Sequence, residues 1–282
     1  MSIHIFNGLV YGALLIVMCS GLALIYGLRR VVNFAHGSLY MLGAYIGYSV
    51  AQKTNFWGAL VIAPAVMALL GVAIDRWGFR LLQDRDPLTV VLVTFGALLV
   101  IEDFVQTTWG KSNLSVATPE SLAFSFNVLG SSFPAYRVAV IGVGAAVAIG
   151  LTLWLRFSKT GLFVRAASTD PTTTAMQGVN TDSLSAMVVG LGTALAGLAG
   201  VVAAPFLSLS PSMSSDVIID SFVVVVIGGL GSLAGAFIAA MVLGQVQSLG
   251  AVWLPDVSAL LPFAIMVGIL LWKPSGLAGS RT

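Results

Sequence analysis

Long apolar stretches follow one another along the whole chain, and short polar connectors separate them. They cover residues 5–27, 37–51, 57–75, 88–108, 136–155, 184–206, 217–250 and 258–272. Most have the length that an α-helix needs to cross about 30 Å of hydrocarbon. The stretches do not alternate with polar residues, and lipid offers backbone groups no partners, so helices are expected rather than a β-barrel. The pattern predicts an all-α polytopic membrane protein, a helical bundle of about eight spans.

Two of the stretches are irregular. Stretch 37–51 is short and follows Asn-Phe-Ala-His-Gly-Ser at 33–38, whereas 217–250 is too long for one helix and is interrupted at 228–232 by Gly-Gly-Leu-Gly-Ser. We expect broken or re-entrant helices near 33–51 and 217–250, the second as a helical hairpin with its tip at the glycines. Both regions contain Gly-Ser-Leu, which suits either an internal repeat of the kind found in transporters or a chance match of small residues.

Composition supports the membrane assignment. Of the 282 residues, 58% are hydrophobic and 9% are charged, and the mean hydropathy is +0.99. A soluble domain carries about 25% charged residues, so these few charges cannot cover a water-facing surface. The 31 glycines suit close helix packing in lipid, where small residues let helices approach. No segment outside the apolar stretches is long enough for a separate soluble domain, so residues 1–282 are expected to form one transmembrane domain.

The basic residues are distributed unevenly among the connectors. If loops 28–36, 76–87 and 156–182 and the C-terminus lie in the cytoplasm, that side holds ten of the 13 Lys and Arg residues. These ten are Arg29, Arg30, Arg76, Arg80, Arg85, Arg156, Lys159, Arg165, Lys273 and Arg281, against Lys53, Lys111 and Arg137 on the other side. Because Lys and Arg accumulate in cytoplasmic loops, we expect a periplasmic N-terminus and a cytoplasmic C-terminus. No basic residue precedes Arg29, so the first stretch is interpreted as a retained span.

The connector 156–182 contains signals for a short helix. Asp170 followed by Pro171 provides an N-cap and a first helical residue, and Gly178 fits the position just after a helix end. These residues predict a helix at about 171–177, after which Asp182 can cap the next membrane helix. From spacing alone, this helix is either an ordinary amphipathic connector or an element that docks on an ATPase.

Several motifs, spread in order from residue 21 to 279, resemble one family. They are the VVNFAHGSLYMLGA run within 27–44, VVIGGLGSLAGAFIAA at 225–240, KPSGLAG at 273–279, and the loop pattern Thr160-Gly161, Arg165-Ala166, Asp170, Ala175 and Gly178-Val179-Asn180. Together they resemble the branched-chain amino-acid ABC permeases of the LivH type. The runs NFAHG and GGLGS are the most specific, and the resemblance covers nearly the whole chain.

The resemblance implies a role and a set of partners. It implies a permease subunit of a bacterial importer in the inner membrane, for branched-chain or other amino acids or similar small polar solutes, working by ATP-driven alternating access. The partners would be a second permease of the LivM type, two cytoplasmic ATPase subunits and a periplasmic substrate-binding protein. The helix 171–177 would be the coupling helix, within an ATPase-coupling set of Thr160, Gly161, Arg165, Asp170, Pro171, Ala175 and Gly178.

Polar residues inside the apolar stretches are candidates for a translocation path, since ionisable groups at membrane depth are costly. Glu102 and Asp103 lie about two thirds of the way along 88–108, with Thr94 and Gln106 on either side. They either line the path or mark the outer end of a helix within reach of water.

Asn33 and His36 flank the short second stretch. They either present a helix N-terminus to an anionic group of the substrate, or cap the helix and mark the headgroup level. Gly228, Gly229, Gly231 and Ser232 belong to the expected break in the second irregular stretch.

Acidic and amide groups of the last third have competing interpretations. Asp216 and Asp220 fit charges at a helix N-terminus, with docking of the binding protein as the alternative. Gln245 and Gln247, two residues apart, cannot share a helix face, so one is expected to face the path and the other a neighbouring helix.

Signals for other chemistry are weak. Gly110-Lys111-Ser112 resembles the end of a phosphate loop, but Val105 stands where the first glycine is required. The single cysteine, Cys19, excludes an intramolecular disulfide and a cysteine-based metal site, and no catalytic or cofactor constellation is expected. ATP hydrolysis is therefore assigned to partner chains. The alternative function is a self-contained channel or secondary transporter, which would need ionisable residues at mid-membrane or a ring of filter residues.

Overall fold

The computed structural model describes residues 1–83, 85–128 and 131–279. Its helices are α1 (Ser2–Arg29), α2 (Ala35–Lys53), α3 (Phe56–Ile74), α4 (Pro87–Trp109), α5 (Ala135–Phe157), α6 (Lys159–Thr169), α7 (Pro171–Met176), α8 (Thr181–Ala203), α9 (Met213–Gly228), α10 (Leu233–Trp253) and α11 (Leu261–Trp272). Short turns of helix, η1 (Asp75–Phe79), η2 (Glu120–Leu122) and η3 (Pro255–Leu260), and the strands β1 (Ser125–Val128) and β2 (Ser131–Pro134) complete the fold. The predicted all-α polytopic fold is confirmed.

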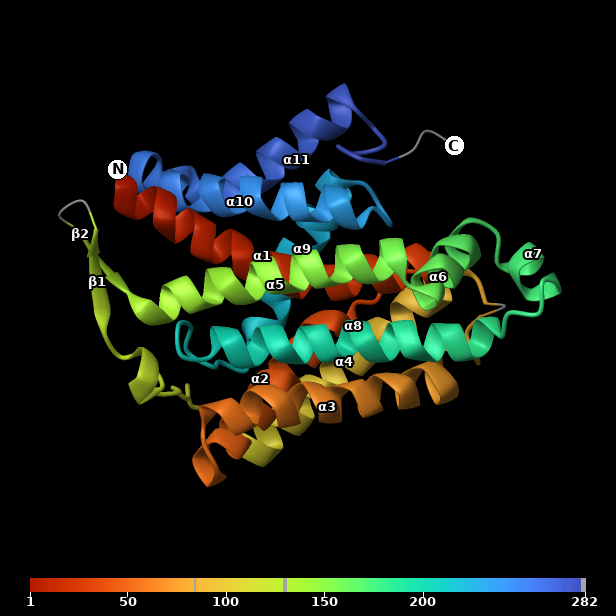
Figure 1. Cartoon of the computed structure of the whole chain (residues 1–282), viewed down its shortest axis with the longest axis horizontal. Helices are drawn as coiled ribbons and strands as arrows, with labels where there is room; N and C mark the ends of the chain where they lie inside the picture. The colour runs from red at the N-terminus through yellow and green to blue at the C-terminus, as the bar shows by residue number, and fades with distance from the viewer. Residues whose placement is uncertain (84, 129–130, 280–282) are drawn as a thin grey trace.

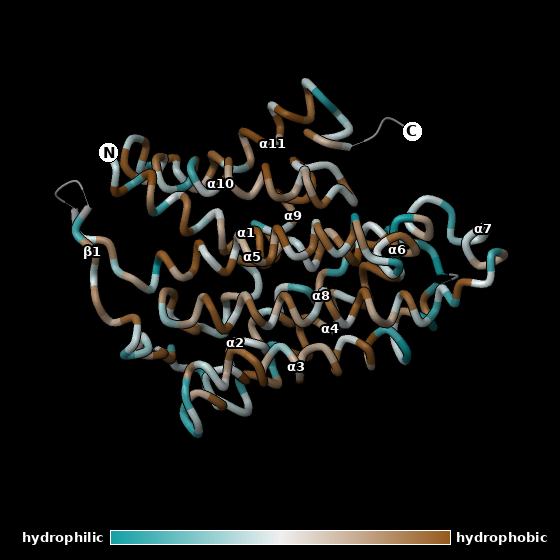
Figure 2. The backbone as a smooth tube through the Cα atoms, viewed as in Figure 1, coloured by the Kyte–Doolittle hydropathy of each residue, from teal (hydrophilic) through white to brown (hydrophobic). Residues whose placement is uncertain are grey.

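The long helices lie side by side along the longest axis of the molecule (Figure 1). Within the described residues, seven helices are long and apolar enough to cross a membrane: α1, α3 with η1, α4, α5, α8, α10, and α11 with η3. Apolar residues predominate along these helices, and hydrophilic residues gather in the connections at the two ends (Figure 2). Helix α2 corresponds to the first irregular stretch, and α9 together with α10 corresponds to the second.

Helices α1 and α8 form the centre of the bundle. α1 packs against α8, α10 and α5, while α8 packs against α2 and α3. The close approaches occur at glycines: a Cβ at Gly21 would overlap the carbonyl oxygen of Gly192, and a Cβ at Gly43 would overlap the Cα of Gly197. Lipid gives apolar side chains no reason to leave it, so these backbone contacts supply the packing that holds the centre together.

The first irregular stretch begins with a break and continues as an unbroken helix. The chain leaves α1 at Arg30, whose φ of 54° is left-handed, and stays non-helical until α2 begins. The N-cap position of α2 is Phe34, and the side chain of the preceding Asn33 accepts a hydrogen bond from the amide of Ala35 at 3.1 Å. His36 is fully buried, and its Nε2 lies 3.0 Å from the carbonyl oxygen of Met18 on α1. His36 therefore does not mark the headgroup level, because α2 starts inside the bundle.

The second irregular stretch is divided as predicted. α9 ends at Gly228 and α10 begins at Leu233, and the intervening Gly229 and Gly231 have φ values of 100° and 83°. Ser232 caps α10 by accepting a hydrogen bond from the amide of Gly235 at 3.1 Å. The two helices pack against each other, so 217–250 contains a helical hairpin with its tip at the glycines.

The C-terminal segment packs back onto that tip. The amides of Leu277 and Ala278 donate to the last carbonyls of α9, at Ile227 (2.8 Å) and Gly228 (3.0 Å). Gly276, at φ 76°, approaches Gly229 so closely that a Cβ there would lie 2.5 Å from its backbone. Two sequence motifs far apart in the chain therefore form one structural unit, which satisfies carbonyl groups that a helix end leaves free.

The basic residues are sorted between the two ends of the bundle. We call the end where α1, α3 and α5 finish the arginine-rich end, and the end with β1 and β2 the β-hairpin end (Figure 1). The arginine-rich end holds Arg29, Arg30, Arg76, Arg80, Arg85, Arg156, Lys159, Arg165 and Lys273, and the β-hairpin end holds Lys53, Lys111 and Arg137. Arg281 of the predicted set lies outside the described residues. The uneven distribution of basic residues in the sequence therefore corresponds to the two ends of the bundle.

The connection between α4 and α5 contains the only strands among the described residues. β1 and β2 pair antiparallel at the β-hairpin end. Leu114 of the same connection pairs with Leu209, which precedes α9. This pairing ties the entrance of α9 to the segment that follows α4.

Candidate functional site

Two consecutive short helices, α6 and α7, protrude from the arginine-rich end (Figure 1). The sequence predicts one helix in this connector at about 171–177; the structure has α7 at Pro171–Met176 and also α6. Ser158 caps α6 by accepting from the amide of Gly161 at 2.9 Å, and a Cβ at Gly161 would overlap the carbonyl oxygen of Trp154. The turn between α5 and α6 is therefore tight and specified by its small residues.

Asp170 sets the start of α7, as predicted. Its carboxylate accepts from the amide of Thr173 at 3.0 Å and from the hydroxyl of the same residue. These hydrogen bonds, the hydroxyl first and then the amide, lower the pKa of Asp170 below the usual value for aspartate. Gly178, at φ 83°, follows the end of the helix in the left-handed conformation that favours glycine.

The start of α8 differs from the prediction. Asn180, rather than Asp182, is the N-cap, and its side chain accepts from the amide of Ser183 at 2.9 Å. Asp182 lies in the first turn and pairs with Arg80 at 3.6 Å. Both residue types suit an N-cap, and the position of the first helical turn decided between them.

The predicted coupling residues are mostly solvent-exposed. Arg165, Asp170, Pro171, Ala175 and Gly178 are exposed, as is Thr160, which accepts from the indole of Trp154 at 3.0 Å. Large apolar side chains are exposed beside them: Leu162 is 54%, Phe163 38% and Met176 79% exposed. An apolar surface of this kind, outside the spanning helices, suits contact with another protein.

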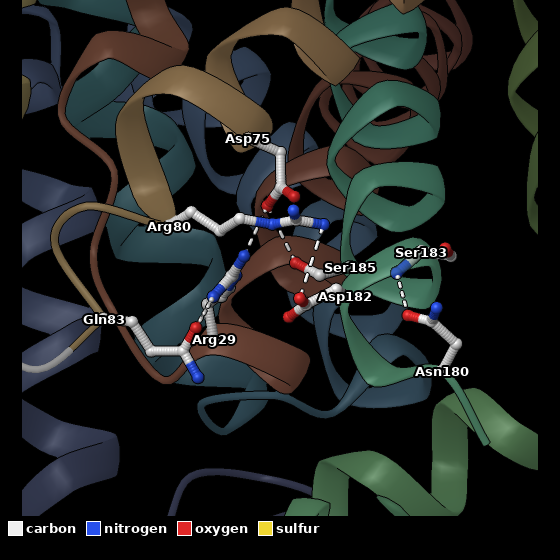
Figure 3. A network of polar contacts seen from close by, with 8 residues as sticks. All are labelled: Arg29, Asp75, Arg80, Gln83, Asn180, Asp182, Ser183 and Ser185. Carbon is white, nitrogen blue, oxygen red and sulfur yellow. Dashed lines mark hydrogen bonds and ion pairs between the residues drawn. The ribbon is translucent and has the colours of Figure 1, made fainter. Parts of the chain in front are cut away.

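Sequence reasoning overlooked a polar network where α1, α3 and α8 meet (Figure 3). Asp75 is fully buried and accepts from Nη2 of Arg29 at 2.7 Å and from the hydroxyl of Ser185 at 2.8 Å. Nη1 of Arg29 reaches Oε1 of Gln83 at 3.4 Å. In the sequence, Arg29 appears only as one of the basic residues that predict topology. Asp75 could have been noticed as an acidic residue at the end of an apolar stretch.

The acidic path candidates lie toward the β-hairpin end of α4. Glu102 accepts a hydrogen bond from the hydroxyl of Ser214, at the start of α9. Asp103 is exposed, and Gln106 is half-buried. The structure thus brings Glu102 next to a second helix and leaves the carboxylate of Asp103 on the outside of this single chain.

Another group of candidates lies near the break before α2. Thr94 is buried, and its hydroxyl accepts from the amide of Phe34 at 3.3 Å. Together with buried Asn33 and His36, it forms a polar region in the interior of the bundle. Nδ1 of His36 has no hydrogen-bond partner among the described residues.

The polar candidates of the last third of the chain contact neighbouring helices. Gln245 donates to the carbonyl oxygen of Ile5 at 3.1 Å, so its amide contacts α1. Gln247 donates to Asp220 at 3.2 Å, and Asp220 also accepts from the hydroxyl of Tyr11 at 2.6 Å. Both glutamines therefore bind neighbouring helices, and Asp220 links α1, α9 and α10 instead of serving as a simple helix-end charge.

The glycines and the serine of the hairpin tip lie at the arginine-rich end. They contact the C-terminal segment, and Gly231 also faces Gly27 at the end of α1. The candidates chosen from the sequence thus fall into separate groups along the bundle.

Comparisons with known proteins agree over nearly the whole chain. Residues 4–270 match the family described as branched-chain amino acid transport system, permease component. The high-affinity branched-chain amino acid transport system permease protein LivH of Escherichia coli K12 is 27% identical over 98% of this chain and 94% of its own length. BraD of Pseudomonas aeruginosa, with the same description, is 26% identical over 97% and 94%.

A second branch of permeases matches less completely. The corresponding LivM protein of Salmonella typhimurium is 25% identical over 93% of this chain and 67% of its own length. No solved structure matches the chain. Because the family match covers far more than half of the chain, the protein belongs to the family of branched-chain amino acid transport system permease components.

Proposed function

We propose that this chain is the LivH-type permease subunit of a bacterial ABC importer for branched-chain or other amino acids or similar small polar solutes. The observation that carries the proposal is the family match over residues 4–270, in a chain whose described residues contain seven helices able to span a membrane. The motifs singled out in the sequence occupy defined places in the fold, at the break before α2, at the α9–α10 tip and in α7.

We place the arginine-rich end in the cytoplasm. Nine described basic residues lie at this end against three at the other, and Lys and Arg accumulate in cytoplasmic loops. The N-terminus would then be periplasmic and the C-terminus cytoplasmic, in the inner membrane. Antibody or protease access to tags at the two ends, in intact and opened cells, tests this orientation directly.

We assign the coupling role to α7, with α6 as its support. α7 lies at the end assigned to the cytoplasm, outside the spanning helices, and Met176 on it is largely exposed. Two ATPase subunits would bind this surface on this chain and on a second, LivM-type permease, and a periplasmic binding protein would meet the β-hairpin end. Alternating access would follow from ATP binding and hydrolysis on the partner chains.

Purification of the chain with its native partners tests this function. We expect two ATPases and a second permease to co-elute, and a binding protein loaded with its amino acid to stimulate ATP hydrolysis and uptake. Met176→Asp should lose stimulated uptake while membrane insertion is retained. Leu81→Asp is the matched control, since Leu81 is 73% exposed at the same end but outside α6 and α7. Normal uptake by Met176→Asp would contradict the coupling assignment.

We further propose that Glu102, Asp103 and Gln106 line the outer part of the path. A charged side chain facing lipid at this depth is costly, and Asp103 is exposed in the single chain, so water or a second permease must cover it. Cys19 is the only cysteine, so a Cys19→Ser background allows single cysteines to be placed. Cysteine at Asp103 should react with a membrane-impermeant thiol reagent, and cysteine at Ile149, exposed on α5, should not. Equal reactivity at both positions would remove Asp103 from the path.

The alternative is a self-contained channel or secondary transporter. It predicts solute movement in liposomes that contain this chain alone and no ATP. Such movement would replace the importer proposal.

A further inference from the structure

A polar cavity lies at the arginine-rich end, beside the network of Figure 3. It has a volume of about 240 Å³ and is lined by Leu28, Arg29, Arg30, Gln83, Ala167, Pro171, Thr181, Asp182 and Ser185. These residues come from the end of α1, the segment after η1, α6, α7 and the first turns of α8. A water molecule occupies about 30 Å³ of liquid, so the cavity has room for a phosphate-sized group with its hydration.

The ion pairs between described residues around the cavity leave one cation without an acidic partner. Asp75 pairs with Arg29, and Asp182 pairs with Arg80. Within the same part of the chain, Arg30 contacts only carbonyl oxygens, those of Ser168 (3.1 Å) and Thr169 (3.3 Å), through Nη2. A guanidinium group carries five N–H donors, so most of the donors of Arg30 remain available to an anion.

Further positive charge lies in the same region. Arg29 also lines the cavity, and its guanidinium group donates to Asp75 and Gln83. The N-terminal turn of α8, with Thr181, contributes the positive end of a 23-residue helix. An oxyanion accepts several charge-assisted hydrogen bonds at once, so it suits the unused N–H groups of Arg30.

The backbone at Arg30 is held in an uncommon conformation. Its φ of 54° follows the last helical residue of α1, a position where glycine is the usual residue. Among described non-glycine residues, Arg30 alone has a positive φ. Strained conformations of this kind cluster at ligand-binding sites, because the side chain held there has a use that offsets the strain.

The cavity also lies at the level where lipid headgroups are found. α1 loses its apolar character at Arg29, and Trp77, 77% exposed, lies near the end of the neighbouring span. Tryptophan at a helix end is typical of the membrane interface. Basic pockets between membrane helices bind anionic headgroups by the same chemistry.

We propose that this cavity binds the phosphate group of an anionic ligand, with the free N–H groups of Arg30 as the donors and a phospholipid headgroup as the source. The bound headgroup would connect α1, α6, α7 and α8. The cavity would bind it whichever solute the protein carries and whichever face of the membrane the cavity occupies.

Native mass spectrometry of the purified full-length chain tests the site. The protein in detergent is titrated with phosphatidylglycerol and, separately, with the zwitterionic phosphatidylcholine. We expect at least about tenfold tighter retention of phosphatidylglycerol, the effect of roughly one charge-assisted hydrogen bond. Inorganic phosphate is added in a third arm: displacement of the lipid by phosphate shows that the phosphate group is what the site recognises.

Three variants give the test its specificity. Arg30→Gln removes the free cation, and Gln83→Glu keeps the acceptor for Arg29 while adding a negative charge to the lining. Both should lose the preference for phosphatidylglycerol. Arg156→Gln removes an exposed arginine of the same end that does not line the cavity, and should keep it.

The possible results distinguish a phospholipid ligand from a soluble anion, and both from failure of the proposal. Binding of inorganic phosphate without any preference between the lipids would assign the site to a soluble anion, and the cavity would keep its proposed chemistry. If Arg30→Gln fails to fold, the lipid preference of Gln83→Glu still tests the proposal. Equal retention of both lipids with no effect of phosphate, or an unchanged preference in Gln83→Glu, overturns the proposal.

Discussion

Helices α1 and α5 are equally apolar and both span the bundle, yet their surroundings are opposite. In the most apolar window of α1, 89% of the residues are buried inside the chain, against 17% for α5. The difference lies in where small residues fall. Gly12 and Gly21 of α1 approach the backbones of α10 and α8, whereas α5 makes such an approach at Gly144, against Ala13 of α1. A Cβ added at Gly142 or Gly150 of α5 would meet no described atom within 4 Å. Apolar character therefore identifies a membrane helix, and close backbone contact identifies a central one.

The largest expected effect comes from filling a central glycine. Gly21→Leu should prevent folding or cost more than about 3 kcal/mol, since a side chain there would overlap the backbone of Gly192. Gly150→Leu on α5 should be tolerated, because its added side chain meets open space. Size-exclusion profiles and thermal unfolding in detergent measure both. A folded Gly21→Leu variant with wild-type stability would refute the distinction between the two helices.

The next effect concerns a buried charge at the end of α1. Asp75→Asn should cost about 3–5 kcal/mol, because it leaves Arg29 partly buried without its counter-charge. The matched control is Asp182→Asn, which breaks the more exposed pair with Arg80 and should cost no more than about 1 kcal/mol. Thermal unfolding of both variants under one condition makes the comparison, and equal losses would contradict it.

A smaller effect is expected from a hydrogen bond between helices. Tyr11→Phe removes the donor to Asp220 and should destabilise by about 0.6 kcal/mol, the average for such bonds inside membranes. Thr152→Val on α5 removes a hydroxyl whose hydrogen bond, within the described part of the chain, goes to Ala148 of the same helix, and should leave the unfolding temperature unchanged. A loss at Thr152 that matches the loss at Tyr11 would show that α5 is less peripheral than its exposure indicates.

The smallest effect lies outside the bundle, at α7. The folded-state pKa of Asp170 is lowered by its bonds to Thr173, so its stabilisation of α7 is complete above the ordinary aspartate pKa of about 3.9 and is lost as the pH falls through the lower value. Hydrogen exchange of residues 171–176, corrected for intrinsic rates, should show this loss. Asp170→Asn keeps a cap without a titrating group, and should show no such pH dependence.

Much of the fold was predictable because it depends on local signals. The apolar stretches, the glycine break at Gly229 and the cap at Asp170 each depend on a few neighbouring residues. Features that depend on the position of another helix were left open or misassigned. Asn180 rather than Asp182 caps α8, and the burial of His36 excludes only its headgroup-level alternative. Gln247 bonds to a neighbouring helix, as was expected of one of the two glutamines, but Gln245 does so as well. The place of a residue in the periodic pattern of its helix does not determine which neighbouring helix its side chain contacts.

The order of residues along the chain is enough to specify a helical membrane protein with a broken α9–α10 element and a capped helix in its longest basic loop. Hydropathy, glycine conformation and helix capping each depend on a few neighbouring residues, so they can be recognised from the sequence. Three features became visible only in the folded bundle: α1 and α8 are central, Asp75 meets Arg29, and the C-terminal segment closes the α9–α10 tip. Those contacts join residues far apart in the chain, and they depend on how closely the backbones of neighbouring helices approach.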